Sequence, residues 1–116
     1  MREMREPTYF VLASLLDGPL HGYAIIKRAA GLSGGRVTMA TGTLYTALDR
    51  LAAEGYVRLV SEEIVNGRAR RSYGLTEAGQ DALRDEAARM ERAAGVVTGR
   101  ARRGRATATM PAVRPA

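Results

Sequence analysis

Small hydroxyl side chains and one arginine share a face of residues 41–57, which read TGTLYTALDRLAAEGYV. The polar side chains of this face are those of Thr43, Thr46, Asp49 and Arg50. Threonine donates hydrogen bonds to phosphate, and its methyl group contacts thymine, so this pattern is typical of nucleic-acid contact. Thr41 stands where a helix N-cap is expected, and Gly42 lets the helix N-terminus approach a phosphate.

The same stretch has the periodicity of a helix with one buried face. Apolar residues recur at i, i+3, i+4, i+7 and i+8: Leu44, Ala47, Leu48, Leu51 and Ala52. Tyr45 lies between the buried and polar faces, so its hydroxyl binds a DNA phosphate or its ring serves only packing. Arg50 either reaches a phosphate or pairs with Glu54 at i+4. We count Thr41, Gly42, Tyr45 and Arg50 with Thr43 and Thr46 as DNA-binding candidates.

A β-hairpin is predicted to follow directly. Tyr56–Val65 and Arg68–Leu75 read as strands, and Asn66-Gly67 between them is a strong two-residue turn signal. The turn sets the register. It places opposite one another Val65 and Arg68, Glu63 and Arg70, Glu62 and Arg71, and Val60 and Tyr73.

The arginines of the hairpin differ in their predicted partners. Arg68 lies beside the turn without an acidic residue opposite, so it is the first candidate for a DNA contact at the tip. Arg70 is the second candidate. For Arg70 and Arg71 the alternative is a cross-strand ion pair, which is worth little at a surface.

Two helices are predicted to precede this unit, at residues 7–16 and 21–30. Tyr9, Leu12, Ala13 and Leu16 form the apolar stripe of the first, and Tyr23, Ile26, Ala29 and Ala30 that of the second. His21 is interpreted as a packing residue at the helix start. Tyr23 and Lys27 are candidates for phosphate contact from this supporting helix.

A fourth helix, at residues 77–97 with Thr76 as its cap, lacks a partner surface in this scheme. We therefore expect it to dimerise with its copy in a second subunit. The predicted dimerisation residues are Leu83, Met90, Ala94 and Val97. From Gly99 onward the chain is rich in Arg, Ala and Thr without a period, and we expect it to be disordered. Its arginines either add non-specific DNA affinity or remain solvated.

Composition limits the function classes. The 116 residues suggest one domain, and the 46% hydrophobic content suggests a globular one. Without cysteine and with one histidine, metal sites built on these side chains are excluded, and no nucleophile–base pair suggests an enzyme. No apolar run is long enough to span a membrane, and no signal-peptide pattern is present, so we expect a cytoplasmic protein.

The net charge of +6 belongs mostly to the end of the chain. Residues 1–75 hold 10 basic and 7 acidic side chains, residues 76–98 hold 3 and 5, and residues 99–116 hold 5 arginines and no acid. The positions of the charges, rather than their sum, must therefore support DNA binding.

Three blocks of this sequence together resemble the PadR family of transcriptional regulators. They are GPLHGYAIIKR (18–28), GTLYTALDRLAAEGYV (42–57) and RRSYGLTEAGQDAL (70–83). The resemblance implies a winged helix-turn-helix, dimerisation through a single C-terminal helix and repression by promoter occlusion. This sequence departs from the family's pattern at three positions. Ala24 stands where the family often has an acidic residue, Thr46 where it often has a proline, and Ser72 where it often has a tyrosine.

The resemblance also bears on effectors, since some members bind aromatic small molecules between the dimer helices, sandwiched by tryptophan. This chain has no tryptophan. The absence of tryptophan therefore argues against a ligand bound in this way, and a small aromatic effector is the one further partner that the resemblance allows. No cofactor is implied.

We predict a mainly α fold with a small β-hairpin. Residues 1–75 form a winged helix-turn-helix DNA-binding domain, 76–98 the dimerisation helix and 99–116 the tail. The predicted function is sequence-specific regulation as a homodimer on a near-palindromic operator in double-stranded DNA. Two alternatives stay open, a protein-interaction module without DNA binding and a small-molecule sensor. Unchanged function in Arg68→Ala would favour the first, and thermal stabilisation by an aromatic ligand the second.

Overall fold

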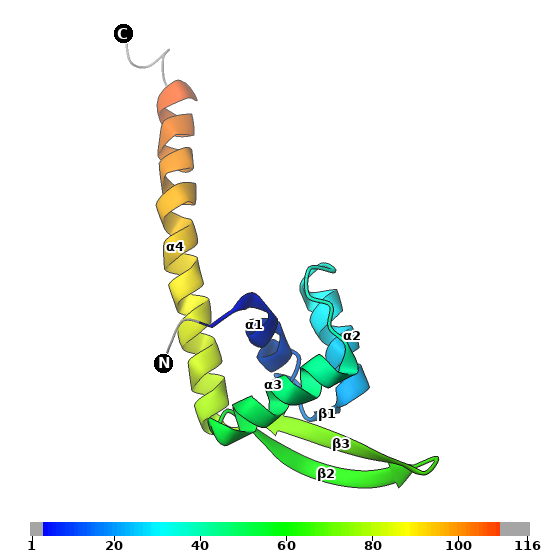
Figure 1. The fold of residues 1–116 in the computed structure, drawn as a ribbon. Helices are drawn as coiled ribbons and strands as arrows, with labels where there is room; N and C mark the ends of the chain where they lie inside the picture. The colour runs from blue at the N-terminus through cyan, green and yellow to red at the C-terminus, as the bar shows by residue number, and fades with distance from the viewer. Residues whose placement is uncertain (1–3, 110–116) are drawn as a thin grey trace. The chain divides into compact units, whose positions relative to one another are not determined.

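The computed structural model describes the backbone of residues 4–109 and the side chains of residues 4–99. Its elements are α1 (Glu6–Ala13), β1 (Leu20–His21), α2 (Gly22–Leu32), α3 (Thr41–Ala53), β2 (Val57–Val65), β3 (Arg68–Leu75) and α4 (Glu77–Thr109). Figure 1 shows the three short helices beside a sheet whose hairpin extends past them. The predicted fold class, mainly α with a small β-hairpin, is confirmed.

Helix α1 is shorter than predicted. Pro7 lies in its first turn, where a missing N–H costs nothing. After Ala13 the chain tightens, because the N–H groups of Leu15 and Leu16 donate to the carbonyls three residues before them. The tighter turn changes the direction of the side chains that follow Ala13, so that Leu15 is buried and Leu16 is 53% exposed. The placement of Leu16 in the apolar stripe was therefore wrong.

Helix α2 buries a face that overlaps the predicted one only in part, since Ala29 is buried as predicted and Ile26 packs against the core cluster. Its buried residues are Gly22, Ile25 and Ala29, whereas Tyr23 is 67% exposed. The buried face is thus shifted toward Gly22 and Ile25, each of which lies one residue before a residue of the predicted stripe. Glycine gives no apolar signal, so the sequence pattern pointed to Tyr23 in place of Gly22.

Helix α3 has the predicted core face. Leu44, Leu48 and Leu51 are fully buried, and Thr43 and Thr46 are exposed. The prediction that Thr41 caps this helix was wrong, because Ala40 is the N-cap and no side chain caps it. Ala52, predicted to be buried, is exposed near the helix end.

The hairpin has the predicted turn. Asn66 and Gly67 both have positive φ, 53° and 77°, as a two-residue hairpin turn requires. The register confirms the pairs Val65–Arg68, Glu63–Arg70 and Glu62–Arg71. The pair Val60–Tyr73 was wrong, since a bulge between Leu59 and Ser61 sets Leu59 opposite Tyr73.

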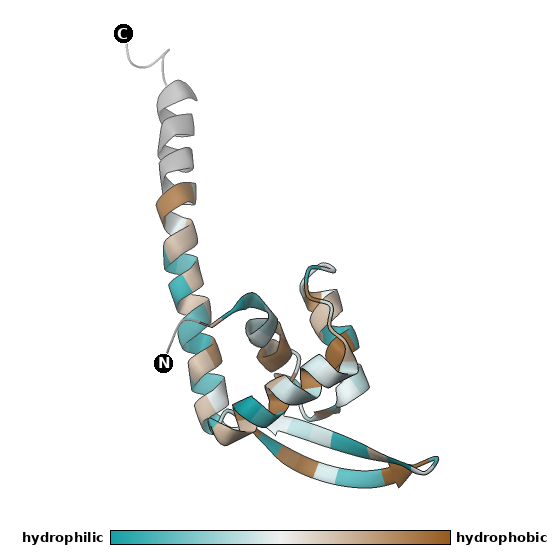
Figure 2. Cartoon of the chain, viewed as in Figure 1, coloured by the Kyte–Doolittle hydropathy of each residue, from teal (hydrophilic) through white to brown (hydrophobic). Residues whose placement is uncertain are grey.

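A short third strand joins this sheet. β1 pairs antiparallel with β3 through Leu20–Tyr73 and His21–Ser72, which gives the strand order β1-β3-β2. Two residues are too short a segment to show an alternating pattern, so β1 was not predicted. Strand β2 is an edge strand on which Leu59 and Ile64 are exposed, and Figure 2 shows hydrophobic and hydrophilic segments along it.

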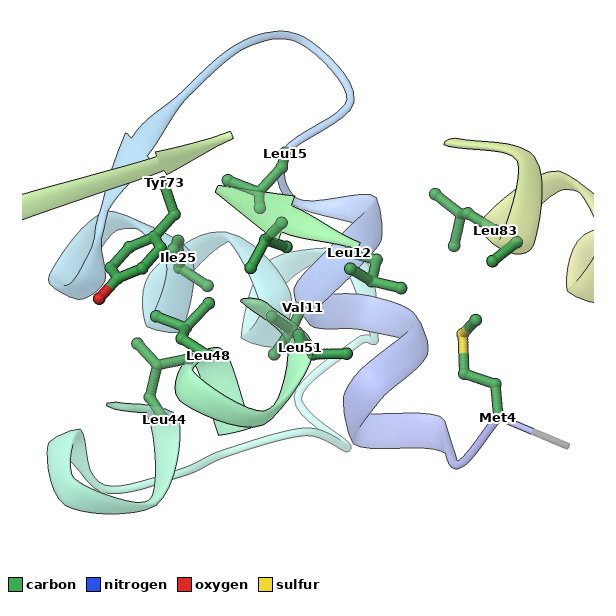
Figure 3. Packing of buried hydrophobic residues seen from close by; sticks show 12 residues of the cluster. Met4, Val11, Leu12, Leu15, Ile25, Leu44, Leu48, Leu51, Tyr73 and Leu83 are labelled. Atoms are coloured by element: carbon green, nitrogen blue, oxygen red, sulfur yellow. The ribbon is translucent and has the colours of Figure 1, made fainter. Parts of the chain in front are cut away.

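One apolar cluster holds α1, α2, α3, the sheet and the start of α4 together (Figure 3). Thr76 caps α4 as predicted, because its Oγ accepts from the Gly79 N–H at 3.0 Å and donates to the Gly55 carbonyl. Leu83 is 4% exposed in this cluster, and Figure 3 shows it facing Met4. The compact unit Met1–Glu86 therefore includes the first turns of α4.

The remainder of α4 belongs to a second unit, Ala87–Ala116. Its helix continues to Thr109, so the expected disorder from Gly99 is wrong for residues 99–109. Arginine and alanine, which dominate this part of the tail, are good helix formers. Residues 110–116 of the predicted tail lie outside the described residues. Across residues 4–109, none of the helices is both long and apolar enough to cross a membrane.

Candidate nucleic-acid interface

The exposed side of α3 forms a shallow hollow, which we call the α3 face. It is lined by Gly42, Thr43, Thr46, Ala47 and Arg50. Four of these five residues were predicted DNA contacts, so the structure brings most of the predicted reading surface together. Gly42 has no neighbouring atom within 4 Å of an added Cβ, which leaves the start of α3 open to an approaching backbone.

The first turn of α3 offers backbone donors to this surface. The N–H groups at a helix start have no intrahelical acceptor, and they favour an anion. Thr41 is exposed at this end and, since it is not the cap, its hydroxyl is not committed to the helix backbone.

Arg50 is held within its own subunit. Its Nη1 lies 3.8 Å from Glu54 Oε1, and its Nη2 donates to Thr8 Oγ1 at 3.3 Å. The predicted i+4 ion pair with Glu54 is thus present, though long. Because both groups are half-exposed, the pair is weak enough for Arg50 to exchange Glu54 for a phosphate.

A second concavity of about 600 Å³, which we call the wing cleft, lies between the hairpin and the start of α2. It is lined by His21, Gly22, Tyr23, Tyr45, Val65, Asn66, Arg68, Ala69 and Arg70. Tyr23, Tyr45, Arg68 and Arg70 are all predicted DNA contacts from three separate stretches of sequence. The fold therefore gathers two hydroxyls and two guanidinium groups around one space.

The hairpin arginines differ in whether they form an ion pair, and Arg71 and Arg68 differ as the predicted register suggested. Arg71 Nε donates to Glu62 Oε2 at 2.7 Å, and the hydrogen bond and charge of Glu62 raise the pKa of Arg71. Arg70 lies opposite Glu63 in the register. Within residues 4–99, neither Arg70 nor Arg68 forms a side-chain ion pair. Both are exposed, so their charges remain available to an anion in the wing cleft.

Lys27 and Tyr23 form a pair on the exposed side of α2. The Lys27 Nζ lies 5.6 Å from the centre of the Tyr23 ring, a cation–π geometry. Lys27 does not line the wing cleft, but this contact sets its charge one helical turn from a cleft residue.

Five of the nine cleft residues were not among the predicted contacts, and two of these, His21 and Gly22, lie where α2 begins. His21 was interpreted as a packing residue, and its Nδ1 in fact accepts from the Ala24 N–H at 3.4 Å, which caps α2. Gly22 was given no role, and it is buried against the Tyr45 hydroxyl. The sequence signals for both residues were their position at the start of a helix and their place in the block GPLHGYAIIKR.

The four predicted dimerisation residues do not share one environment. Leu83 packs in the core of its own subunit, so its assignment to a dimer surface is corrected. Met90, Ala94 and Val97 are exposed on α4.

No group of three or more His, Asp and Glu side chains in the described part of the chain is arranged to hold a metal ion.

Comparison with known proteins gives consistent results. A model of the transcriptional regulator PadR-like family matches residues 11–85. Transcriptional regulator Rv3488 of Mycobacterium tuberculosis is 41% identical over 90 residues, covering 77% of this chain and 79% of its own. An uncharacterized 37.1 kDa protein in transposon TN4556 of Streptomyces fradiae is 46% identical over 87 residues, or 75% of this chain. The chain spans only 24% of the length of that transposon protein.

Solved structures are similar as well. The crystal structure of Bacillus subtilis PadR in complex with operator DNA is 27% identical, with a TM-score of 0.58, and the match covers 66% of this chain and 44% of that one. The same protein in complex with p-coumaric acid matches at 26% identity with a TM-score of 0.53, over 70% of this chain and 43% of that one.

Proposed function

The chain belongs to the PadR-like family of transcriptional regulators, and from this premise we propose that it binds operator DNA as a homodimer and represses transcription. The α3 face enters the major groove, and the wing cleft receives the sugar-phosphate backbone beside it. The observation that carries this proposal is that α3 contributes to two surfaces, one lined by threonines and one by arginines that form no ion pair among the described residues.

The chemistry of the α3 face suits base edges. An α-helix fits the major groove of B-DNA, and short hydroxyl side chains let the helix lie deep in it. Thr43 and Thr46 can donate to or accept from any base edge, and their methyl groups suit the methyl of thymine. Arg50, one turn beyond Thr46, is placed to reach a flanking phosphate.

The chemistry of the wing cleft suits phosphate. Arg68 and Arg70 carry charges without an internal ion pair among the described residues, and Tyr23 and Tyr45 add hydroxyl donors. Such contacts fix the position of a protein on the duplex but do not read its sequence. Lys27, held near Tyr23, extends the same positive surface along α2.

We propose that α4 makes the dimer through Met90, Ala94 and Val97, which lie at i, i+4 and i+7 and are exposed. A two-fold dimer then presents two copies of α3 to two half-sites, so the operator is near-palindromic. Binding of such a dimer occludes a promoter, and a regulator of this kind acts in the cytoplasm, where bacterial DNA lies.

The dimer is tested by placing a charge on this stripe. Val97→Asp should convert the dimer to a monomer in analytical ultracentrifugation, because an unpaired buried carboxylate is costly. Val96→Asp is the matched control, since Val96 is also exposed but lies about 100° away around the helix. Equal behaviour of the two variants contradicts this use of α4.

DNA binding is tested by footprinting the duplex upstream of the gene. The proposal predicts two protected half-sites about 10 base pairs apart, or a multiple of this, related by a two-fold axis. A uniform pattern without protected half-sites contradicts it and favours a protein-interaction role for the same fold.

We propose an aromatic small molecule as the effector class to test first, because the similar Bacillus subtilis PadR was crystallised with p-coumaric acid. A ligand that binds the folded dimer raises its melting temperature by mass action. Since the chain has no tryptophan, aromatic stacking on this ligand must come from tyrosine or phenylalanine. A melting temperature unmoved by p-coumaric acid removes this compound as a candidate.

A further inference from the structure

Gly22, in the first turn of α2, lies against the side chain of Tyr45 from α3. A Cβ atom at residue 22 would stand 2.5 Å from the Tyr45 Oη and 2.8 Å from its Cζ. Both distances are shorter than real Cβ contacts allow, so any residue larger than glycine forces the tyrosine to move. Gly22 is buried, and no other described glycine places a Cβ as close to a side chain.

The ring of Tyr45 has packed neighbours on its inner side. It is half-buried against the core cluster, and its centre lies 6.4 Å from that of the Tyr73 ring at an interplanar angle of 54°. Tyr73 is itself buried in the core. Tyr45 thus sits where α2, α3 and β3 meet, and displacement further inward is blocked.

The free space beside this ring is the wing cleft. Tyr45 and Gly22 both line this concavity of about 600 Å³, together with Arg68 and Arg70. A ring displaced by a Cβ at residue 22 therefore swings outward into the cleft. Because only the far end of one side chain must move, the fold itself can tolerate the change.

We propose that Gly22 is a positioning residue for DNA binding, which leaves room for the Tyr45 ring to lie inward and so keeps the wing cleft open for the DNA backbone. This inference rests on the proposed function, since it assigns a role within the same interface. Gly22 makes no DNA contact through a side chain of its own, and its effect passes entirely through Tyr45.

The test compares two identical substitutions in one helix. Gly22→Ala should weaken binding of the full chain to its upstream duplex by about tenfold or more, the usual effect of disturbing a central contact. Gly31→Ala is the matched control, because Gly31 also lies in α2 and an added Cβ there meets no atom within 4 Å. This control should bind within about twofold of the wild type.

A double-variant cycle separates positioning from a general structural effect. In the Tyr45→Ala background the added methyl has no ring to displace, so Gly22→Ala should cause no further loss of affinity. Equal losses in both backgrounds, or a Gly22→Ala variant that binds like the wild type, overturn the proposal. If Gly22→Ala alone fails to fold, recovery of the fold in the double variant supports it, and no recovery overturns it.

A readout without DNA keeps this test independent of the proposed function. The ring resonances of Tyr45, identified by their loss in Tyr45→Ala, should shift in Gly22→Ala and stay unchanged in Gly31→Ala. Unmoved resonances overturn the proposal even if DNA binding is established. A wild-type chain that selects no duplex contradicts the proposed function, whereas the ring resonances still decide whether Gly22 positions Tyr45.

Discussion

Helix α3 contributes residues to both the α3 face and the wing cleft, but the two surfaces are built from opposite chemistry. The α3 face exposes threonines and a glycine, and its one cation, Arg50, is held by Thr8 and Glu54. The wing cleft holds two arginines without an ion pair inside the described chain. In this protein, the surface with the shape to read bases is thus nearly neutral, and the charge lies beside it.

This difference separates specificity from affinity. Contacts from neutral hydroxyls to base edges are short-ranged and distinguish one sequence from another. Contacts from arginine to phosphate release counterions, so they depend on salt and are blind to sequence. The two surfaces can therefore be told apart by measuring each variant on two duplexes over a salt series.

The largest effect is expected from the wing cleft. Arg68→Ala combined with Arg70→Ala should weaken binding to operator and scrambled duplexes alike, by roughly thirtyfold, and reduce the salt slope by about 2. Fluorescence anisotropy of labelled duplexes at several salt concentrations measures both quantities. A loss confined to the operator would mean that these arginines read bases, which breaks the division between the surfaces.

A smaller effect is expected from the α3 face. Thr43→Ala combined with Thr46→Ala should lower the preference for operator over scrambled duplex by about tenfold, with the salt slope unchanged. Thr43→Val refines the result, because valine keeps the methyl group and loses the hydroxyl. If the preference survives in the double variant, the threonines are only solvated and another surface reads the sequence.

The smallest effect is expected from Arg71, one residue from Arg70. Because its guanidinium donates to Glu62 at 2.7 Å, Arg71→Ala should change the affinity by less than about twofold. The salt slope should fall by much less than about 1, the change expected for one lost phosphate contact. The melting temperature should also change little, since an exposed ion pair contributes little to stability. A salt slope reduced as much as in Arg68→Ala would show that Arg71 leaves Glu62 for a phosphate.

Much of this architecture could be predicted from periodicity and turn chemistry. The spacing of Leu44, Leu48 and Leu51 is specific to one buried helix face, and all three are buried. Asn66-Gly67 fixes a two-residue turn, and the register then follows as far as Glu62–Arg71. These features depend on local sequence, which is why they could be found without a structure.

The remaining features depend on contacts between distant segments. The bulge at Leu59 and Ser61 shifts the register where β3 also pairs with β1, and no local signal marks it. Tyr23 was assigned to the buried face of α2 in place of Gly22 because glycine carries no apolar side chain to count. The wing cleft joins residues from α2, α3 and the hairpin, so four of its members were predicted one by one but not as a site.

The central claim is that the folded interface, and not the basic tail, selects the operator. It is tested most directly by the affinity of the wild type and of a chain ending at Thr98 for the upstream and scrambled duplexes over a salt series. The account predicts a preference for the upstream duplex that survives removal of residues 99–116. Equal binding to both duplexes, abolished by salt and by removal of the tail, contradicts it.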